Sequence, residues 1–291
     1  MEEKQQNWNT AILLIHCQDS KWINALVTNF IYKNNGNIIH LDQHVDEYEN
    51  IFFMRIEWEL HWFDIHPLEI KERFSKQVWN NFDMSRELFF SSYIPRMALF
   101  VSKESHCLFD ILSRYKAWEW DVEIPLIISN HSNLQWVAEN FGIPFYHIEV
   151  NKNNKKQQEL KQIQLLKEYQ IDFIVLARYM QILTSQLIEE YQNNIINIHH
   201  SFLPAFPGAK PYESAYKRGV KIVWATSHYV TEELDAGPII EQDVIRVSHK
   251  DSIKDMVRKW KDIEKIVLSR AIYAHIKKKI LVYNNRTVVF S

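Results

Sequence analysis

The chain has 291 residues, 34 basic against 36 acidic side chains, a formal net charge of -2, and 46% hydrophobic residues. This balance is typical of a globular protein and excludes a disordered chain, and it gives no support to nucleic acid or an anionic membrane as the main partner. The N-terminus lacks the basic start and apolar core of a signal peptide, and no window approaches the roughly 18 apolar residues of a membrane span. We therefore expect a cytoplasmic protein that acts on a small molecule.

The first third of the chain predicts a small α+β domain. Predicted strands cover residues 11–17, 37–46, 51–58 and 86–90. Helical spacing of apolar residues separates the first two strands, a second helix begins after Pro67, and Gly36 suits the left-handed position that ends the first helix. The resulting β-α-β-β-α-β order predicts a ferredoxin-like domain over residues 1–92, one of the two domains that this length indicates.

From residue 93 the pattern changes to strands that alternate with helices. Predicted strands cover residues 96–102, 124–130, 143–150 and 172–177. Predicted helices begin at His106, Leu134 and Lys156. This alternation predicts an α/β domain over residues 93–291, Rossmann-like, with a mostly parallel sheet and ligands at the carboxyl ends of its strands. A long helical pattern over 252–279 and a hairpin that turns at Asn284 and Asn285 close the chain.

Two polar clusters follow apolar strands in this second domain. In "NNIINIHH", Asn197 and His199 are two residues apart on a strand, so their side chains project to the same face. In "TSHYVTEELDAGPII", His228 lies near a strand end and Asp235 lies in a loop constrained by a Gly-Pro pair. An amide, an imidazole and a carboxylate can support acyl chemistry without a metal, but polar residues also gather at strand ends for capping. The spacing alone leaves both interpretations open.

Longer motifs in both domains resemble one family. They are "INIHHSFLPAF", "GAKPY", "HYVTEELDAGPIIEQDV", "VLARYMQIL" and "NRTVVF" in the second domain, and "HCQD", "GNIIHLDQHVD" and "FFMRIEW" in the first. Together they resemble the formyltetrahydrofolate deformylases, or 10-formyltetrahydrofolate hydrolases. The short Asn-x-His and Leu-Asp-x-Gly-Pro-Ile motifs are similar to those of all folate-dependent formyltransferases, whereas the doubled histidine, "ARYMQ" and "GAKPY" single out the hydrolases. The resemblance implies that residues 1–92 are a regulatory or oligomerisation ACT domain and residues 93–291 a formyltransferase-like catalytic domain.

The resemblance also implies the reaction and the roles of its residues. Water attacks the formyl carbon of 10-formyltetrahydrofolate and releases formate and tetrahydrofolate, with no metal and no tightly bound cofactor. Asn197 would hold the oxyanion of the tetrahedral intermediate, and His199 would assist proton transfer to the departing N10. Asp235 would position the water and keep His199 in the useful protonation state, and His228 would support them as a hydrogen-bond partner.

Folate-binding residues follow from the same resemblance. Met180, Ile182 and Leu183 would form the apolar walls of the pterin pocket, and backbone groups there and around Val230 would bind the pterin edge. His200 would help to hold water or to exclude an amine acceptor, with a buried structural histidine as the plainer alternative.

The resemblance also bears on the formyl acceptor and on the metabolic role of the protein. In the transferase relatives a glycine-rich loop takes the acceptor's phosphate, and "VSKESHC" at 101–107 has no glycine, which favours water as the acceptor. We expect a homo-oligomer of one-carbon metabolism that balances the folate pools and supplies formate for purine biosynthesis. Two alternatives remain at this point: a formyltransferase that passes the formyl group to an amine, and a catalytically inactive sensor of folate or an amino acid.

Four tryptophans stand where the resemblance leads us to expect glycine. They are Trp22, Trp118, Trp224 and Trp260. The chain has only 5 glycines, against the roughly 7% of residues that is average usage. One hypothesis is lineage drift, with Trp22 blocking the ligand loop of the ACT domain and removing effector control. The other is that a codon meaning glycine in the source was decoded as tryptophan, since all four changes are of one kind.

Overall fold

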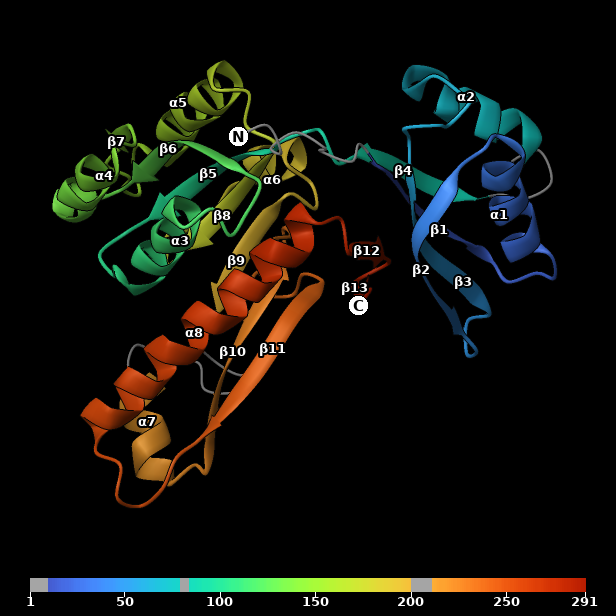
Figure 1. Cartoon of the computed structure of the whole chain (residues 1–291). Helices are drawn as coiled ribbons and strands as arrows, with labels where there is room; N and C mark the ends of the chain where they lie inside the picture. The colour runs from blue at the N-terminus through green and yellow to red at the C-terminus, as the bar shows by residue number, and fades with distance from the viewer. Residues whose placement is uncertain (1–9, 79–83, 200–210) are drawn as a thin grey trace, which may run out of the picture. The chain divides into compact units, whose positions relative to one another are not determined.

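The computed structural model describes residues 10–78, 84–199 and 211–291 of the chain. The chain forms two compact units, one of Met1–Ile94 with Val288–Ser291, and one of Pro95–Thr287. Figure 1 shows the first unit in blue to cyan, apart from its C-terminal residues 288–291 in red, and the second in green to red. Within the described ranges, no helix combines the length and apolarity needed to cross a membrane.

The N-terminal unit is built on a four-stranded antiparallel sheet. Its elements are β1 (Thr10–Gln18), α1 (Ile23–Lys33), β2 (Asn37–Asp46), β3 (Ile51–Glu59), α2 (Pro67–Gln77) and β4 (Ser85–Phe90). The strand order is β2-β3-β1-β4. Phe30 of α1 and Phe74 of α2 are buried in one core with Trp58 of the sheet. The predicted β-α-β-β-α-β order is confirmed, and this strand order is that of a ferredoxin-like sheet.

The prediction for Gly36 is wrong. Asn35 takes the left-handed conformation after α1, with φ at 60°, and asparagine tolerates it because its short polar side chain bonds locally. Gly36 is needed for space instead, because a Cβ there would lie 2.5 Å from Cγ2 of Ile31 and 2.9 Å from Cδ2 of Phe63. The glycine therefore lets the chain pass closely over α1 as it enters β2.

The C-terminal unit alternates strands and helices through its first half. In chain order these are β5 (Arg96–Val101), α3 (His106–Lys116), β6 (Glu123–Ser129), α4 (Gln135–Phe141), β7 (Phe145–His147), α5 (Lys155–Glu168), β8 (Phe173–Ala177), α6 (Ser185–Glu190) and β9 (Ile195–His199). The elements that follow are α7 (Pro211–Arg218), β10 (Ile222–Tyr229), β11 (Ile239–Arg246), α8 (Ile253–Ile276), β12 (Ile280–Tyr283) and β13 (Arg286–Val289). The prediction of a strand over 143–150 is too long, because β7 pairs only with Ile127–Ser129 of β6.

Seven strands form the central sheet of this unit in the order β11-β10-β9-β8-β5-β6-β7. β5 to β9 are parallel, and β10 is antiparallel to β9 and β11. The mostly parallel sheet that the sequence predicts is confirmed. Because β6 lies on one side of β5 and β8 on the other, the strand order reverses beside β5, and ligands of such sheets bind at that point.

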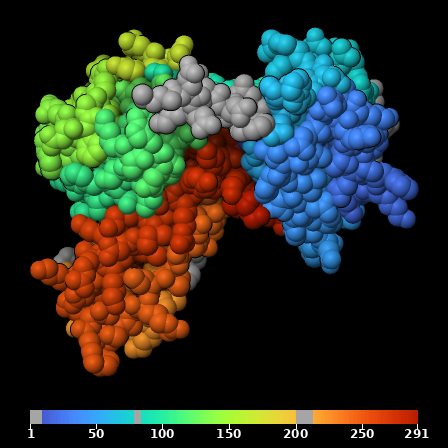
Figure 2. All heavy atoms as spheres, viewed as in Figure 1, coloured from blue at the N-terminus to red at the C-terminus, as the bar shows by residue number. Residues whose placement is uncertain are grey.

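Helices cover both faces of the sheet. Alternate residues of β5 point to opposite sides: Leu99 packs in the core under α3, α4 and α8, and Phe100 packs in the core under α5 and α6. Figure 2 shows α8 as a continuous orange-red band beside the green atoms of α3, and these two helices pack together. Because helices cover the two faces, a ligand site can form at the carboxyl ends of the strands, between the two helical layers.

Candidate active site at the carboxyl ends of the central strands

Two neighbouring strands bring the predicted polar residues together. Asn197 and His199 lie at the end of β9, and β10 runs antiparallel beside it with His228 opposite Asn197 and Thr226 opposite His199. The hydroxyl of Ser227 donates to the carbonyl oxygen of Asn197 over 3.0 Å, which adds a bond between the two strands. The strand pairing thus fixes two of the predicted residues, 31 positions apart in the chain, against each other.

Asp235 reaches the same place through a tight loop after β10. It adopts a left-handed backbone conformation, with φ at 55°, which aspartate tolerates better than most residues. Two residues later, a Cβ on Gly237 would lie 1.8 Å from the carbonyl oxygen of Tyr229, so only glycine fits. The N–H of Tyr229 donates to the carbonyl oxygen of Pro238 over 2.9 Å, and this bond closes the loop.

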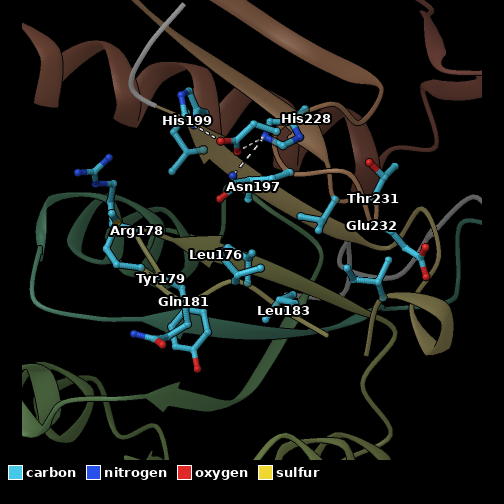
Figure 3. A pocket seen from close by; sticks show the side chains of 17 residues that line it. Leu176, Arg178, Tyr179, Gln181, Leu183, Asn197, His199, His228, Thr231 and Glu232 are labelled. Atoms are coloured by element: carbon cyan, nitrogen blue, oxygen red, sulfur yellow. Dashed lines mark hydrogen bonds and ion pairs between the residues drawn. The ribbon is translucent and has the colours of Figure 1, made fainter. Parts of the chain in front are cut away.

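Short distances join these four side chains (Figure 3). Nδ1 of His199 lies 3.3 Å from Oδ2 of Asp235, and Nε2 of His228 lies 3.6 Å from Oδ1 of the same carboxylate. Nδ2 of Asn197 lies 3.2 Å from Nε2 of His228. The structure therefore brings together Asn197, His199, His228 and Asp235, all of which the sequence analysis singles out.

The surroundings of His228 determine which of its ring nitrogens carries the proton. The imidazole is 1% exposed, and its Nδ1 lies 2.9 Å from the carbonyl oxygen of Tyr229. A carbonyl oxygen only accepts, so Nδ1 is the donor, and Nε2 of the neutral ring accepts from the amide of Asn197. The Asn197 nitrogen has two hydrogens, so this bond orients the amide and leaves its second N–H for a ligand.

The electrostatics of the cluster keep Asp235 ionised. The hydrogen bond from His199 holds the pKa of the Asp235 carboxyl far below its ordinary value, against the smaller opposing effect of burial. A carboxylate in this state can orient an imidazole and stabilise its protonated form. The cluster can therefore accept and return a proton without the carboxylate itself being protonated.

The cluster opens into a pocket at the ends of β8, β9 and β10. All four predicted folate-binding residues line it: Met180, Ile182, Leu183 and Val230. Leu183 is buried, but Met180 and Ile182 are 60% and 61% exposed and present apolar surface to the opening. His200 and residues 201–210 lie outside the described residues.

The structure adds lining residues that the sequence analysis did not assign. They are Leu176, Arg178, Tyr179, Gln181, Ile188, Ile198, Thr231, Glu232 and Leu234. Arg178 and Gln181 stand inside "ARYMQ", the motif that resembles the hydrolases, so the motif itself was the available signal. In Figure 3, Leu176, Tyr179, Gln181 and Leu183 lie on one side of the pocket, with the polar cluster on the other.

A second buried polar cluster lies beside the pocket. Glu264 of α8 is fully buried, its Oε2 lies 2.5 Å from Nε2 of His106, and its Oε1 lies 3.5 Å from Nη1 of Arg178. Within the described ranges, the one group of three side chains close enough to hold a metal ion is His106, Cys107 and Glu264. The guanidinium of Arg178 beside the carboxylate opposes a cation there, and burial raises the pKa of the Cys107 thiol.

The four unexpected tryptophans fall into two pairs. Trp22 and Trp118 are exposed and both have positive φ, 78° and 59°, a conformation in which a side chain other than glycine is strained. Trp224 of β10 and Trp260 of α8 are buried, and Nε1 of Trp260 donates to the carbonyl oxygen of Trp224 over 2.8 Å. The first pair thus meets a backbone suited to glycine, and the second pair packs between sheet and helix.

Comparisons with known proteins agree with this architecture. A sequence profile of the Formyl transferase family matches residues 95–272. A formyltetrahydrofolate deformylase of Synechocystis sp. is 52% identical over 282 residues, which cover 97% of this chain and 99% of that protein. The crystal structure of a formyltetrahydrofolate deformylase from Pseudomonas syringae pv. tomato is 46% identical, with a TM-score of 0.94 over 99% of this chain and 96% of that one.

A transferase structure marks the contrast. Glycinamide ribonucleotide transformylase 1 from Symbiobacterium toebii is 25% identical, with a TM-score of 0.64, and 98% of that chain matches only 70% of this one. The deformylases instead match nearly the whole length. With more than half of this chain matched by the Formyl transferase profile and 97% of it by a deformylase that is 52% identical, the chain belongs to the formyltetrahydrofolate deformylase family.

Proposed function

We propose that this chain hydrolyses 10-formyltetrahydrofolate to formate and tetrahydrofolate. The observation that carries the proposal is the convergence of Asn197, His199 and Asp235, with His228, at the wall of one apolar pocket. These groups provide an oxyanion donor, a proton carrier and an orienting carboxylate, which is what acyl transfer to water requires. The reaction then needs no tightly bound cofactor and no metal.

The proposed roles follow from the geometry of each side chain. The second N–H of Asn197 donates to the oxyanion that forms when water attacks the formyl carbon, because His228 fixes the amide through its first N–H. His199 faces Asp235 with Nδ1, so Nε2 carries the proton to N10 of the departing tetrahydrofolate. Asp235 holds that imidazole and the attacking water. A preorganised donor of this kind is worth roughly 10²- to 10³-fold in kcat.

The folate binds in the adjoining part of the pocket. Met180, Ile182 and Leu183 form the apolar wall against which the pterin ring packs, and backbone groups there and around Val230 bind its polar edge. A ring that packs against exposed methionine and isoleucine removes apolar surface from water, which favours binding. His200, beside His199 in the sequence, helps to hold the water or to exclude an amine.

The N-terminal unit is an ACT domain that regulates the enzyme or holds a homo-oligomer together. Its support is the ferredoxin-like strand order and the sequence resemblance of residues 1–92. Trp22 lies between β1 and α1 with 75% of its surface exposed. Under the lineage-drift hypothesis it blocks the ligand loop of the ACT domain and removes effector control. We place the enzyme in the cytoplasm, where it balances the one-carbon folate pools and supplies formate for purine biosynthesis.

The test is formate release from 10-formyltetrahydrofolate by the purified chain, with His199→Ala measured in parallel. We expect release that depends on His199, and a matched control, Gln170→Gly, that retains it, because Gln170 is exposed and outside the pocket lining. Glycinamide ribonucleotide is added in a second arm and should not accelerate loss of the formyl group. Tetrahydrofolate binding without formate release, or acceleration by the amine, would contradict the proposal.

A further inference from the structure

Arg178 is a buried cation in a pocket wall that otherwise carries no permanent positive charge. Among the described residues that line the pocket it is the one Lys or Arg, and its side chain is 9% exposed. Arginine stays charged at all physiological pH values, and burial of such a charge is costly unless it is compensated. A buried cation at this position therefore indicates that an anionic group contacts it, and that group can belong to the protein, to a ligand, or to both.

The protein supplies a compensating charge through Glu264. This fully buried carboxylate divides its oxygens between two partners, Oε2 toward His106 at 2.5 Å and Oε1 toward Arg178 at 3.5 Å. His106 is the first residue of α3 after β5, and Arg178 directly follows β8. β5 and β8 are adjacent at the point where the strand order reverses, which is where ligands of such sheets bind. Glu264 therefore fixes the guanidinium in place at the natural ligand position of the fold.

The strand register sets Arg178 beside the catalytic cluster. Leu176 of β8 pairs with Asn197 of β9; His199 is the last residue of β9, and Arg178 directly follows the last residue of β8. Figure 3 agrees, because the guanidinium of Arg178 extends toward the side of the pocket on which His199 lies, away from Tyr179 and Gln181. The guanidinium thus extends toward the side of the pocket that carries the reacting groups.

The backbone of Arg178 is strained, so a side chain at this position lowers the stability of the fold. Its φ is 64°, a left-handed conformation that disfavours a side chain as long as arginine, and glycine would fit without strain. Strained residues of this kind gather at functional sites, where the surrounding structure holds them. Here the strain accompanies a charge that no other described lining residue provides.

The geometry points to Arg178 as the residue that binds the carboxylate of the formate product. This inference rests on the proposed function. In that reaction the bond between the formyl carbon and N10 breaks, a bond from the same carbon to the water oxygen forms, N10 takes a proton, and the second water proton leaves as formic acid ionises. The product beside His199 is therefore an anion, and a guanidinium matches a carboxylate with two parallel N–H donors.

The test measures formate binding directly. Formate is titrated calorimetrically into the full chain loaded with tetrahydrofolate, at constant ionic strength with chloride as the reference anion, so the measurement does not depend on turnover. Arg178→Gly removes the charge and relieves the backbone, and Arg178→Lys keeps a charge without the paired donors. Gln170→Gly is the matched control, because Gln170 also has positive φ, 50°, and is exposed.

We expect the Kd for formate to rise about tenfold or more in Arg178→Gly and by less in Arg178→Lys, since hydrogen bonds to charged groups contribute this much. Gln170→Gly should match the wild type, and the Kd for tetrahydrofolate should change less than about twofold in all variants. An unchanged Kd for formate in a folded Arg178→Gly chain would overturn the inference. So would a loss of tetrahydrofolate affinity equal to the loss of formate affinity, because Arg178 would then shape the folate wall. A wild type that binds formate and releases none from the substrate would overturn the proposed function alone.

Discussion

Asp235 and Glu264 are two carboxylates of the same domain, and each is held between two basic side chains. Asp235 lies between His199 and His228 with 22% of its side chain exposed, whereas Glu264 lies between His106 and Arg178 with none exposed. The partners of Asp235 are both imidazoles, whereas those of Glu264 include a permanent cation. The same arrangement therefore occurs once at an open site in the pocket and once at a closed, fully buried site.

The largest expected effect comes from removal of the charge at the open site. Asp235→Asn should lower kcat for formate release by roughly 10²- to 10⁴-fold, because His199 loses the carboxylate that orients it. Its free energy of unfolding should change by less than about 1 kcal/mol, as for other partly exposed ion pairs. Steady-state kinetics and chemical denaturation of the same preparation measure both quantities. If Asp235→Asn strongly lowered the free energy of unfolding, the proposed difference between Asp235 and Glu264 would be contradicted.

The closed site should show the reverse pattern. Glu264→Gln leaves the guanidinium of Arg178 buried without its compensating charge, and loss of one partner of a buried pair costs about 3 to 5 kcal/mol of unfolding free energy. Denaturation midpoints of Glu264→Gln and Asp235→Asn, measured in parallel, compare the two directly. If Glu264→Gln proved as stable as the wild type, the buried carboxylate would not be compensating Arg178.

The pH dependence of stability sharpens the comparison further. The hydrogen bond from His199 lowers the folded-state pKa of Asp235, so the unfolded chain takes up the proton first as the pH falls. The stabilisation is thus complete above the unfolded value of about 3.9 and is lost as the pH drops below it. The stability difference between the wild type and Asp235→Asn should be constant from pH 7 to 5 and shrink toward pH 3. A difference that grew on acidification would contradict this sign.

The smallest effect concerns Trp118, a left-handed residue outside the sites. Trp118 follows the C-terminal end of α3. The N–H groups of Trp118 and Glu119 donate to the carbonyl oxygens of Tyr115 and Arg114, and a helix ending of this kind strongly favours glycine at the position of Trp118. Trp118→Gly should raise the free energy of unfolding by about 0.5 to 1 kcal/mol, since relief of strain exceeds the added chain entropy. Trp62→Gly is the control, because Trp62 is also exposed but does not have positive φ. This substitution should not raise the free energy of unfolding.

The same residues bear on how the sequence was decoded. Positive φ at Trp22 and Trp118 is what glycine at these positions would adopt, and the buried contact between Trp224 and Trp260 has no such feature. Mass spectrometry of peptides from the native protein decides between the hypotheses. Glycine at all four positions supports the decoding hypothesis, and tryptophan at Trp224 rejects it.

Much of the fold was predictable because local patterns and tertiary structure agree. Helix α3 begins at His106, as its apolar spacing indicates, and Asn197 and His199 share a strand face because alternation has period two. The role of Gly36 was not predictable, because it depends on Phe63, which lies 27 residues away and contacts it only in the folded chain. The contact between Arg178 and Glu264 was not predicted for the same reason, because the sequence around each residue does not indicate that the other lies beside it.

Met180 and Ile182 line the pocket with more than half of their surfaces in water. A pterin that covers them transfers this apolar surface out of solvent, and the signature of that transfer is a negative change in heat capacity on binding. The binding enthalpy of tetrahydrofolate must then become more favourable as the temperature rises, while the entropic contribution declines. Affinity for the folate can consequently stay nearly level across a range of growth temperatures.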